Sequence, residues 1–117
     1  MNELTAKKLI VVLTSLPNLE VAQDLGRHLI YDGLAACVQM QEGLHSIYRW
    51  EGKVCEDREV LFSAKTTIDL WPKIHEYIQK NHPYDLPEII AITPSEYDQA
   101  YGKWVNLEVQ NRGQGKK

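Results

Sequence analysis

Cysteine is scarce in this sequence, with two residues among 117, Cys37 and Cys55. They do not form a Cys-x-x-Cys pair, which excludes a zinc knuckle, a thioredoxin-type redox site and the paired thiols of a copper chaperone. Two isolated thiols in a chain of this length are typical of a reducing compartment. We predict that Cys37, in the stretch LAACV, is a small buried apolar residue, and metal ligation is its alternative role.

Long hydrophobic runs are also missing. No apolar run approaches the ~18 residues that cross a bilayer, so we expect no membrane association. Lys7 and Lys8 precede an apolar run at residues 9–13, which is the order found at the start of a signal peptide. Because this run is short and Pro17 soon follows it, we interpret it as a buried strand instead. The predicted location is cytoplasmic.

Positive charge is not in excess, because 13 lysines and arginines stand against 16 acidic residues, a formal net charge of −3. Sequence-independent nucleic-acid binding needs a basic surface, so we expect no nucleic-acid partner. The basic residues Arg112, Lys116 and Lys117 lie in a glycine-rich end, and we predict a flexible C-terminal tail over residues 111–117. The preceding residues 1–110 are enough for a single domain with one core.

Familiar catalytic motifs are absent from the sequence as well. It contains no GxSxG, no P-loop, no HExxH and no close Cys/His pair. Glu59 and Lys65 could act as an acid and a base only if the fold buries them. We therefore predict that the protein is not an enzyme.

The first part of the chain predicts a strand followed by a helix. Residues 9–13, LIVVL, form a β-branched apolar run typical of a strand buried on both faces. Asn18 is a suitable N-cap, and apolar residues then recur at helical spacing up to a stop at Asp32 and Gly33.

A long hairpin follows, with a first arm at about residues 35–50 and a second arm at about 53–65. Glu51 and Gly52 suit a two-residue turn, and Gly43 fits a bulge where the alternation of the first arm fails. This register places the two cysteines well apart along the hairpin, so we expect no disulfide within one chain.

The second half predicts a helix, a short strand and a last helix. Asp69 is a suitable N-cap because it leaves Pro72 in the first turn of the helix. Residues 88–93, EIIAIT, predict a short core strand, and the last helix is expected to start at Pro94 or Ser95. The order is β-α-β-β-α-β plus a C-terminal helix. It predicts an α+β fold, a ferredoxin-like split βαβ sandwich with an antiparallel sheet and helices on one face.

The hairpin is too long for one compact domain. The first arm, with about 16 residues, spans roughly 50 Å at ~3.3 Å per residue, whereas a compact chain of this length has a radius of gyration of about 13 Å. We infer a homo-oligomer that covers the projecting part, and the alternative is that its apolar residues fold back onto the chain's own body. These residues are Leu44, Ile47, Tyr48, Trp50 and Val54.

Several segments resemble, in order and spacing, the CutA divalent-cation tolerance family: GLAACV, SIYRWEGKV, LFSAKTT, HPYDLPEI and YGKWV, within residues 8–109. The resemblance implies a ferredoxin-like subunit in a tight homotrimer whose architecture is similar to that of PII signalling proteins. It also implies tolerance of copper and other divalent cations as the function, with copper or another divalent cation as the ligand. Animal members of the family are linked to the anchoring of acetylcholinesterase.

The copper ligands assigned to some bacterial relatives map onto this chain only in part. Their cysteine falls on Thr14 and their first histidine falls on Asn81, and both residues are poor copper ligands. The resemblance therefore implies His82 as the remaining metal candidate. Its position at a helix end before Pro83 also fits a purely structural role, and this alternative stays open.

A further set of aromatic and charged residues comes from the hairpin, the HPY loop, the last strand and the last helix. In a trimer of this type these elements could meet at subunit clefts, where aromatic walls and fixed charges suit a small-molecule pocket. The same residue types suit an oligomer interface, which is the other interpretation. The set is Tyr48, Trp50, Glu59, Lys65, Tyr84, Glu88, Tyr101 and Trp104.

Three functional hypotheses follow from these observations. The first is a trimeric protein that binds or responds to copper and other divalent metal ions. The second is a PII-like sensor of a small molecule at the subunit clefts, and the third is a structural trimer that acts through a protein partner. The family resemblance favours the first hypothesis, although the visible ligands alone do not.

Overall fold

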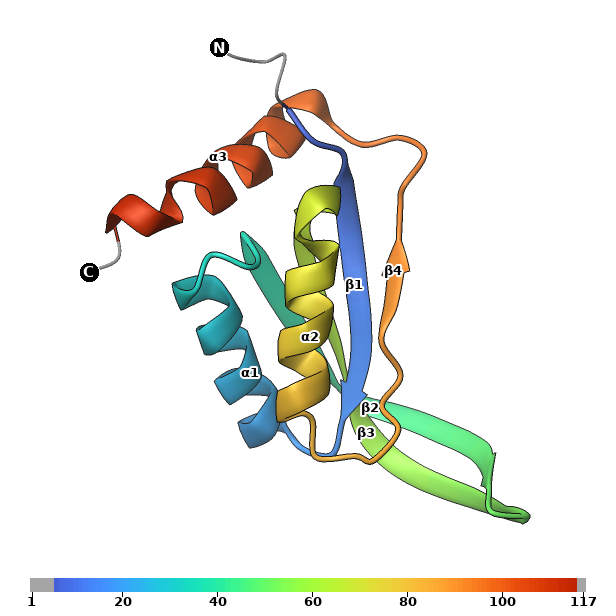
Figure 1. Ribbon diagram of the computed structural model, residues 1–117. Helices are drawn as coiled ribbons and strands as arrows, with labels where there is room; N and C mark the ends of the chain where they lie inside the picture. Colours follow the sequence, from blue (N-terminus) through green and yellow to red (C-terminus); the bar gives the residue numbers. More distant parts are fainter. Residues whose placement is uncertain (1–5, 116–117) are drawn as a thin grey trace.

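The computed structural model describes the backbone of residues 6–115 and the side chains of residues 6–110. The elements follow the predicted order, which confirms the α+β, ferredoxin-like split βαβ arrangement (Figure 1). One antiparallel sheet has the strand order β2-β3-β1-β4. No helix within residues 6–115 is long and apolar enough to cross a membrane. The elements are β1 (Leu9–Leu16), α1 (Leu19–Tyr31), β2 (Cys37–Trp50), β3 (Lys53–Thr67), a 3-10 turn (Ile68–Leu70), α2 (Trp71–Asn81), β4 (Ile90–Ile92) and α3 (Gln99–Gly115).

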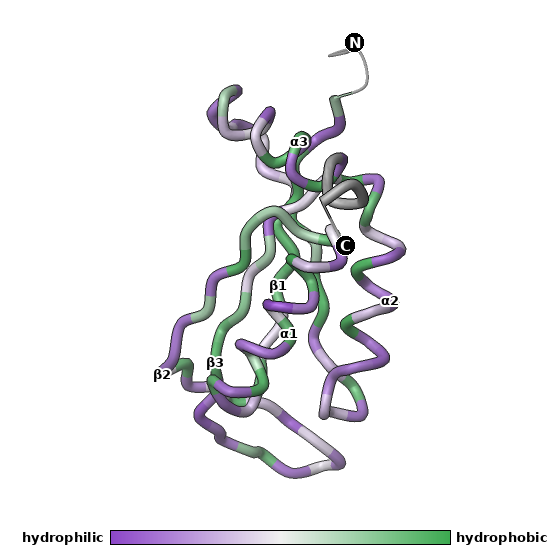
Figure 2. Tube along the Cα trace, turned by 90° about the vertical axis from the view of Figure 1, so that its left-hand side faces the viewer, coloured by the Kyte–Doolittle hydropathy of each residue, from purple (hydrophilic) through white to green (hydrophobic). Residues whose placement is uncertain are grey.

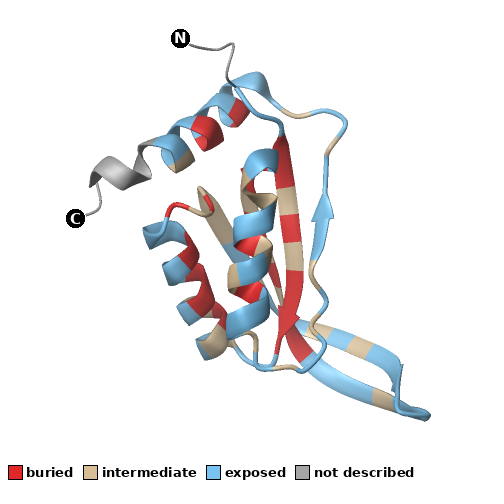
Figure 3. Ribbon diagram, in the orientation of Figure 1, coloured by how far each residue is buried: buried red, intermediate tan, exposed pale blue. Residues whose placement is uncertain are grey.

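The core lies between the sheet and helices α1 and α2, which cover the same face (Figures 1 and 3). Side chains alternate along a strand, so every second residue of β1 and of β3 points toward these helices. Each helix turns one apolar side toward the sheet. The central buried side chains are Ile10, Val12, Leu16, Leu25, Leu29, Phe62, Ala64, Ile74 and Ile78.

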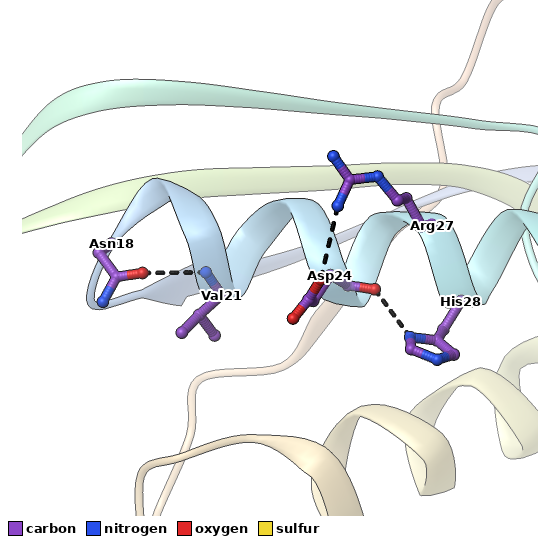
Figure 4. A network of polar contacts seen from close by, with 5 residues as sticks. All are labelled: Asn18, Val21, Asp24, Arg27 and His28. Atoms are coloured by element: carbon purple, nitrogen blue, oxygen red, sulfur yellow. Dashed lines mark hydrogen bonds and ion pairs between the residues drawn. The ribbon is translucent and has the colours of Figure 1, made fainter.

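Helix α1 begins where the sequence predicted. The Asn18 side chain accepts a hydrogen bond of 2.9 Å from the backbone N–H of Val21 and so caps the first turn (Figure 4). Arg27 Nη1 lies 3.5 Å from Asp24 Oδ1 on the exposed side of the helix. The Asp24 carbonyl accepts a hydrogen bond of 2.9 Å from His28 Nδ1. This network occupies the exposed side and leaves the apolar side to pack on the sheet.

The hairpin of β2 and β3 has the predicted turn and bulge. Glu51 and Gly52 have positive φ angles of 51° and 82°, as a two-residue turn that matches the strand twist requires. The pairing register shifts between Glu42 and Leu44, where Gly43 has a φ of 89°. The molecule measures 53 × 34 × 23 Å with a radius of gyration of 15.3 Å, because the hairpin projects beyond the sheet (Figures 1 and 2).

Helix α2 starts differently from the prediction. A 3-10 turn precedes Trp71, and Asp69 lies inside this turn, so the prediction that Asp69 caps the helix was wrong. The residue directly before the helix, Leu70, makes no side-chain cap hydrogen bond. The Asp69 carboxylate instead lies 3.9 Å from the ammonium group of Lys7. Pro72 does lie in the first turn, as predicted.

Helix α3 begins at Gln99, later than the predicted start at Pro94 or Ser95. The physical reason is a cap further along, since Asp98 Oδ2 accepts a hydrogen bond of 3.0 Å from the backbone N–H of Tyr101. The backbone stays helical through residue 115, beyond the predicted end of the domain. The predicted flexible tail, residues 111–117, lies outside the residues whose side chains are described, and its flexibility stays a prediction.

The face of the sheet opposite α1 and α2 carries an apolar patch that we call the open face. Side chains of paired residues on neighbouring strands point the same way, and β1 pairs Val11 with Ile92 and Leu13 with Ile90. Ile90 and Ile92 are each 46% exposed, so β4 is an exposed edge strand and not the predicted core strand. The open face comprises Val11, Leu13, Leu61, Ile90 and Ile92.

Candidate functional site

A groove of about 710 Å³ lies where the hairpin leaves the sheet. Tyr48, Trp50, Asp57 and Glu59 line it from one face of the hairpin, because alternate residues of paired strands point to the same side. Residues 84–86 and 88, from the loop between α2 and β4, line its other side. Small-molecule sites in proteins have volumes of about 300–1,000 Å³, and this groove falls within that range.

The groove is acidic. Its lining includes the carboxylates of Asp57, Glu59, Asp85 and Glu88, together with His45. No lysine or arginine among the described side chains lines it. A concave surface with charge of one sign focuses the electric field and raises the local concentration of counter-ions. The groove therefore attracts cations.

Glu59 is the most buried of these carboxylates, with 8% of its surface exposed. Its Oε2 accepts a hydrogen bond of 2.6 Å from the hydroxyl of Tyr84. Burial and this hydrogen bond raise the pKa of Tyr84 well above its ordinary value of 10.0. Tyr84 therefore stays a neutral donor, and it ties the loop after α2 to β3.

A second tyrosine–carboxylate pair lies on the hairpin itself. The Tyr48 hydroxyl donates to Asp57 Oδ2, and this hydrogen bond raises the pKa of Tyr48 to about 12. Tyr48 is 42% exposed, so this pair is open to water, unlike the pair made by Glu59. Because both phenols stay neutral, the negative charge of the groove comes from its carboxylates alone.

His82 lies directly behind the groove wall. Its Nε2 is 2.9 Å from the Ser15 carbonyl and 3.1 Å from the Thr14 hydroxyl. A carbonyl only accepts, so Nε2 carries the proton, and Nδ1 accepts a hydrogen bond of 3.2 Å from the backbone N–H of Tyr84. Burial lowers the pKa of His82 below its ordinary value of 6.5. Both ring nitrogens are in use, so a metal ion reaches His82 only by replacing one of these hydrogen bonds.

Thr14 and Asn81, the other two positions onto which the resemblance maps copper ligands, offer neither an imidazole nor a thiolate here. Thr14 is 1% exposed, and its hydroxyl contacts the imidazole of His82. The Asn81 side chain donates a hydrogen bond of 2.9 Å to the Tyr77 carbonyl, one turn back along α2. Within the described residues, no three His, Cys, Asp or Glu side chains are grouped so that they could hold one metal ion.

The predicted set of eight residues divides between two regions. Tyr48, Trp50, Glu59, Tyr84 and Glu88 all line the groove, so the structure brings these five together. The other three lie elsewhere, toward the opposite end of β3 and on α3: Lys65, Tyr101 and Trp104.

Cys37 belongs to this second region. It pairs with Lys65 on β3, and the rings of Tyr101 and Trp104 lie 5.6 Å apart on α3. The pKa of Tyr101 is raised, mainly by burial and to a smaller extent by the neighbouring thiol of Cys37. Cys37 is only partly buried, whereas the sequence predicted a small buried apolar residue.

Cys37 and His82 of the same chain cannot share an ion. Cys37 lies on β2, His82 contacts Thr14 on β1, and β3 separates these two strands. Two strand spacings amount to roughly 10 Å, and the offset along β3 adds about 10 Å more. The two residues are independent candidates for metal contact.

Seven of the twelve residues that line the groove were not in the predicted set, among them Ser15, Asp57 and Asp85. Asp57 could have been found by spacing, because it stands two residues before Glu59 in the same strand and so shares its face. Ser15 and Asp85 carry no such signal, since their proximity depends on how the loop after α2 meets the end of β1.

Comparison with known proteins gives consistent similarities. Residues 10–108 match the family model of the CutA1 divalent ion tolerance protein. The chain is 44% identical over 95 residues to the divalent-cation tolerance protein CutA of Thermus thermophilus, covering 81% of this chain and 92% of that protein. The chloroplastic CutA protein of Arabidopsis thaliana is 37% identical, and the match covers 87% of this chain and 56% of that protein. The solved divalent ion tolerance protein CutA1 of Ehrlichia chaffeensis aligns with a TM-score of 0.85 at 31% identity, covering 90% of this chain and 98% of that one.

Removing the Tyr84 hydroxyl tests the buried pair. We expect Tyr84→Phe to lower the free energy of unfolding by about 1–2 kcal/mol, measured by urea denaturation at neutral pH, because Glu59 loses its donor. Tyr48→Phe is the matched control, since it removes the same bond from an exposed carboxylate and should cost clearly less. Equal losses in the two variants would show that burial does not strengthen the Tyr84 bond.

His82 makes stability depend on pH. Because its pKa is lowered in the folded state, the unfolded chain takes up the proton first as the pH falls. The stabilisation is complete above the ordinary pKa of 6.5 and is lost as the pH drops through the folded-state value. Urea denaturation between about pH 7.5 and about pH 5 should show a steeper loss for the wild type than for His82→Gln. Parallel pH profiles would contradict this assignment.

Proposed function

The chain belongs to the CutA1 divalent ion tolerance family, and from that premise we propose that it is a homotrimer that responds to copper and other divalent cations. Its relatives are named as tolerance proteins, and we propose no catalytic activity for it. The net charge of −3 supports a function without nucleic acid. We also propose that the protein acts in the cytoplasm and has no membrane partner.

The acidic groove is the observation that carries this proposal. It concentrates cations next to His82, which contacts two residues of the groove wall, Ser15 and Tyr84. Copper prefers imidazole nitrogen to carboxylate oxygen. His82 would bind it through Nδ1 by giving up the Tyr84 N–H, the longest of its three hydrogen bonds. Cys37 stays a second and separate candidate ligand.

The homotrimer is supported by the apolar surface that the single chain leaves uncovered. Large apolar side chains on the open face and on the projecting hairpin are exposed together, which is unusual for a monomer. Neighbouring copies would cover both surfaces. The exposed residues concerned are Ile47, Val54, Ile90 and Ile92.

The shape of the groove favours a second function, a PII-like sensor of a small molecule. The groove has the volume and the three aromatic rings, Tyr48, Trp50 and Tyr84, that are typical of a small-molecule site. A bare metal ion needs neither a large volume nor aromatic walls. The two functions differ in what occupies the groove, so binding measurements separate them. A structural trimer that acts through a protein partner predicts neither kind of binding.

Native mass spectrometry with limiting Cu²⁺ tests the metal proposal. We expect the untagged wild type to hold a whole number of copper ions per subunit, and His82→Ala to lose them because it lacks the imidazole nitrogen beside the groove. His28→Ala is the matched control, since His28 lies on the exposed side of α1. Scattered adducts of the same extent in all three proteins would contradict copper binding at His82.

A charge on the open face tests the assembly. We expect the wild type to have three times the 13.5 kDa mass of one chain, and Ile92→Asp to dissociate because the carboxylate would be buried at the interface. Ile30→Asp is the matched control, because Ile30 is 40% exposed on α1 while Ile92 is 46% exposed on β4. Light scattering that gives the same mass for both variants would contradict an interface on this face.

A further inference from the structure

Four carboxylates line the groove, those of Asp57, Glu59, Asp85 and Glu88. A Mg²⁺ or Ca²⁺ ion needs several oxygen ligands within about 2.0–2.6 Å of one point. Within the described part of the chain, no group of three His, Cys, Asp or Glu side chains meets this condition. A larger cation with several N–H donors can instead contact carboxylates that lie some distance apart. The layout of negative charge therefore suits an organic cation better than a bare metal ion.

The aromatic walls point to the same kind of ligand. Tyr48, Trp50 and Tyr84 all line the groove, and Trp50 is 41% exposed, so its ring is available to a ligand. An ammonium or guanidinium group over the face of such a ring is attracted by its quadrupole, most strongly for tryptophan. The alkyl part of a ligand gains from the same apolar surface.

Glu59 supplies the buried end of the site. An ionised carboxylate accepts about four hydrogen bonds, and the Tyr84 hydroxyl provides one of them. A buried charge is costly unless it is paired, and no described lysine or arginine lines the groove to pair with it. A positively charged head group would supply both the missing charge and further donors.

The groove also disfavours anions. The hydroxyl hydrogens of Tyr48 and Tyr84 are donated to Asp57 and Glu59, so neither phenol offers its proton to a ligand. The four carboxylates of the lining, when ionised, offer only acceptor oxygens. A carboxylate or phosphate ligand would meet repulsion from every acidic residue of the lining.

We propose that this groove binds a small organic cation, with its ammonium or guanidinium head at Glu59 and its alkyl part against Trp50 and Tyr48. The inference names the ligand class for the small-molecule function above and rests on that alternative. It does not require copper at His82, so the copper experiment and the one below can fail independently.

Calorimetric titration of the full-length protein at low ionic strength tests the proposal. The probes are cadaverine and tetramethylammonium, with pentanediol and tert-butanol as their uncharged counterparts. We expect at least one cation to bind with saturable heat while its uncharged counterpart does not. The proposal is overturned if neither cation binds, or if charged and uncharged probes bind alike.

Variants locate the binding site. Glu59→Gln should weaken cation binding by roughly tenfold, and Trp50→Ala by about fivefold. Glu56→Gln is the matched control, because it removes a carboxylate from the opposite face of the same strand, outside the groove. Its affinity should stay within about twofold of the wild type. Equal weakening by Glu56→Gln would show general electrostatic attraction and overturn the site.

Two further measurements keep the result decisive. Glu88→Gln repeats the test at an exposed groove carboxylate, in case Glu59→Gln does not fold. Titration with Mg²⁺ and with Cu²⁺ alone gives the competing outcome. If these ions bind with the same dependence on Glu59 and Glu88, and the organic cations do not, the groove is a metal site and the proposal is wrong.

Discussion

The unequal lengths of two paired strands determine most of this structure. β1 has eight residues and β3 has 15, and β1 pairs only with residues 60–67 of β3. The remainder of β3 pairs with β2 alone, beyond the helices and beyond the core. At the step where β1 ends, Ser15 and Glu59 lie at the edge of the sheet, and the loop after α2 passes beside them. The groove forms at this step because the sheet narrows there.

Features that depend on local sequence pattern were predicted correctly. The Glu51–Gly52 turn needs positive φ, and the bulge at Gly43 interrupts an alternation, so both were visible in the residues themselves. The division of the aromatic and charged set could not be predicted, because it depends on how α3 and the loop after α2 are placed on the sheet. The exposure of β4 was missed for a related reason: an apolar run is typical of a buried strand, but the described part of the chain leaves this strand exposed.

The burial of Glu59 affects both the stability of the groove and its ability to bind a ligand. Burying Glu59 without a partner would cost several kcal/mol, and one phenol compensates for only part of this. The pair with Tyr84 also fixes the loop, and His82 fixes the same loop to β1 through Ser15. A loop held at two points is preorganised, so a ligand that binds there spends little free energy on ordering it. The same preorganisation resists a metal ion at His82, which must first break one of these contacts.

The proposed assembly and the proposed ligand binding involve the same strand, β1. Val11, Leu13 and Ser15 point to one side of β1, so the open face runs into the groove without a break. A copy that packs on the open face thus comes close to the groove and can form part of its wall. If the assembled form binds the ligand more tightly than the single chain does, mass action makes the ligand stabilise the assembly by RT ln(1 + [L]/Kd) per site. By the same linkage, a change on the open face alters affinity in the groove without touching a groove residue.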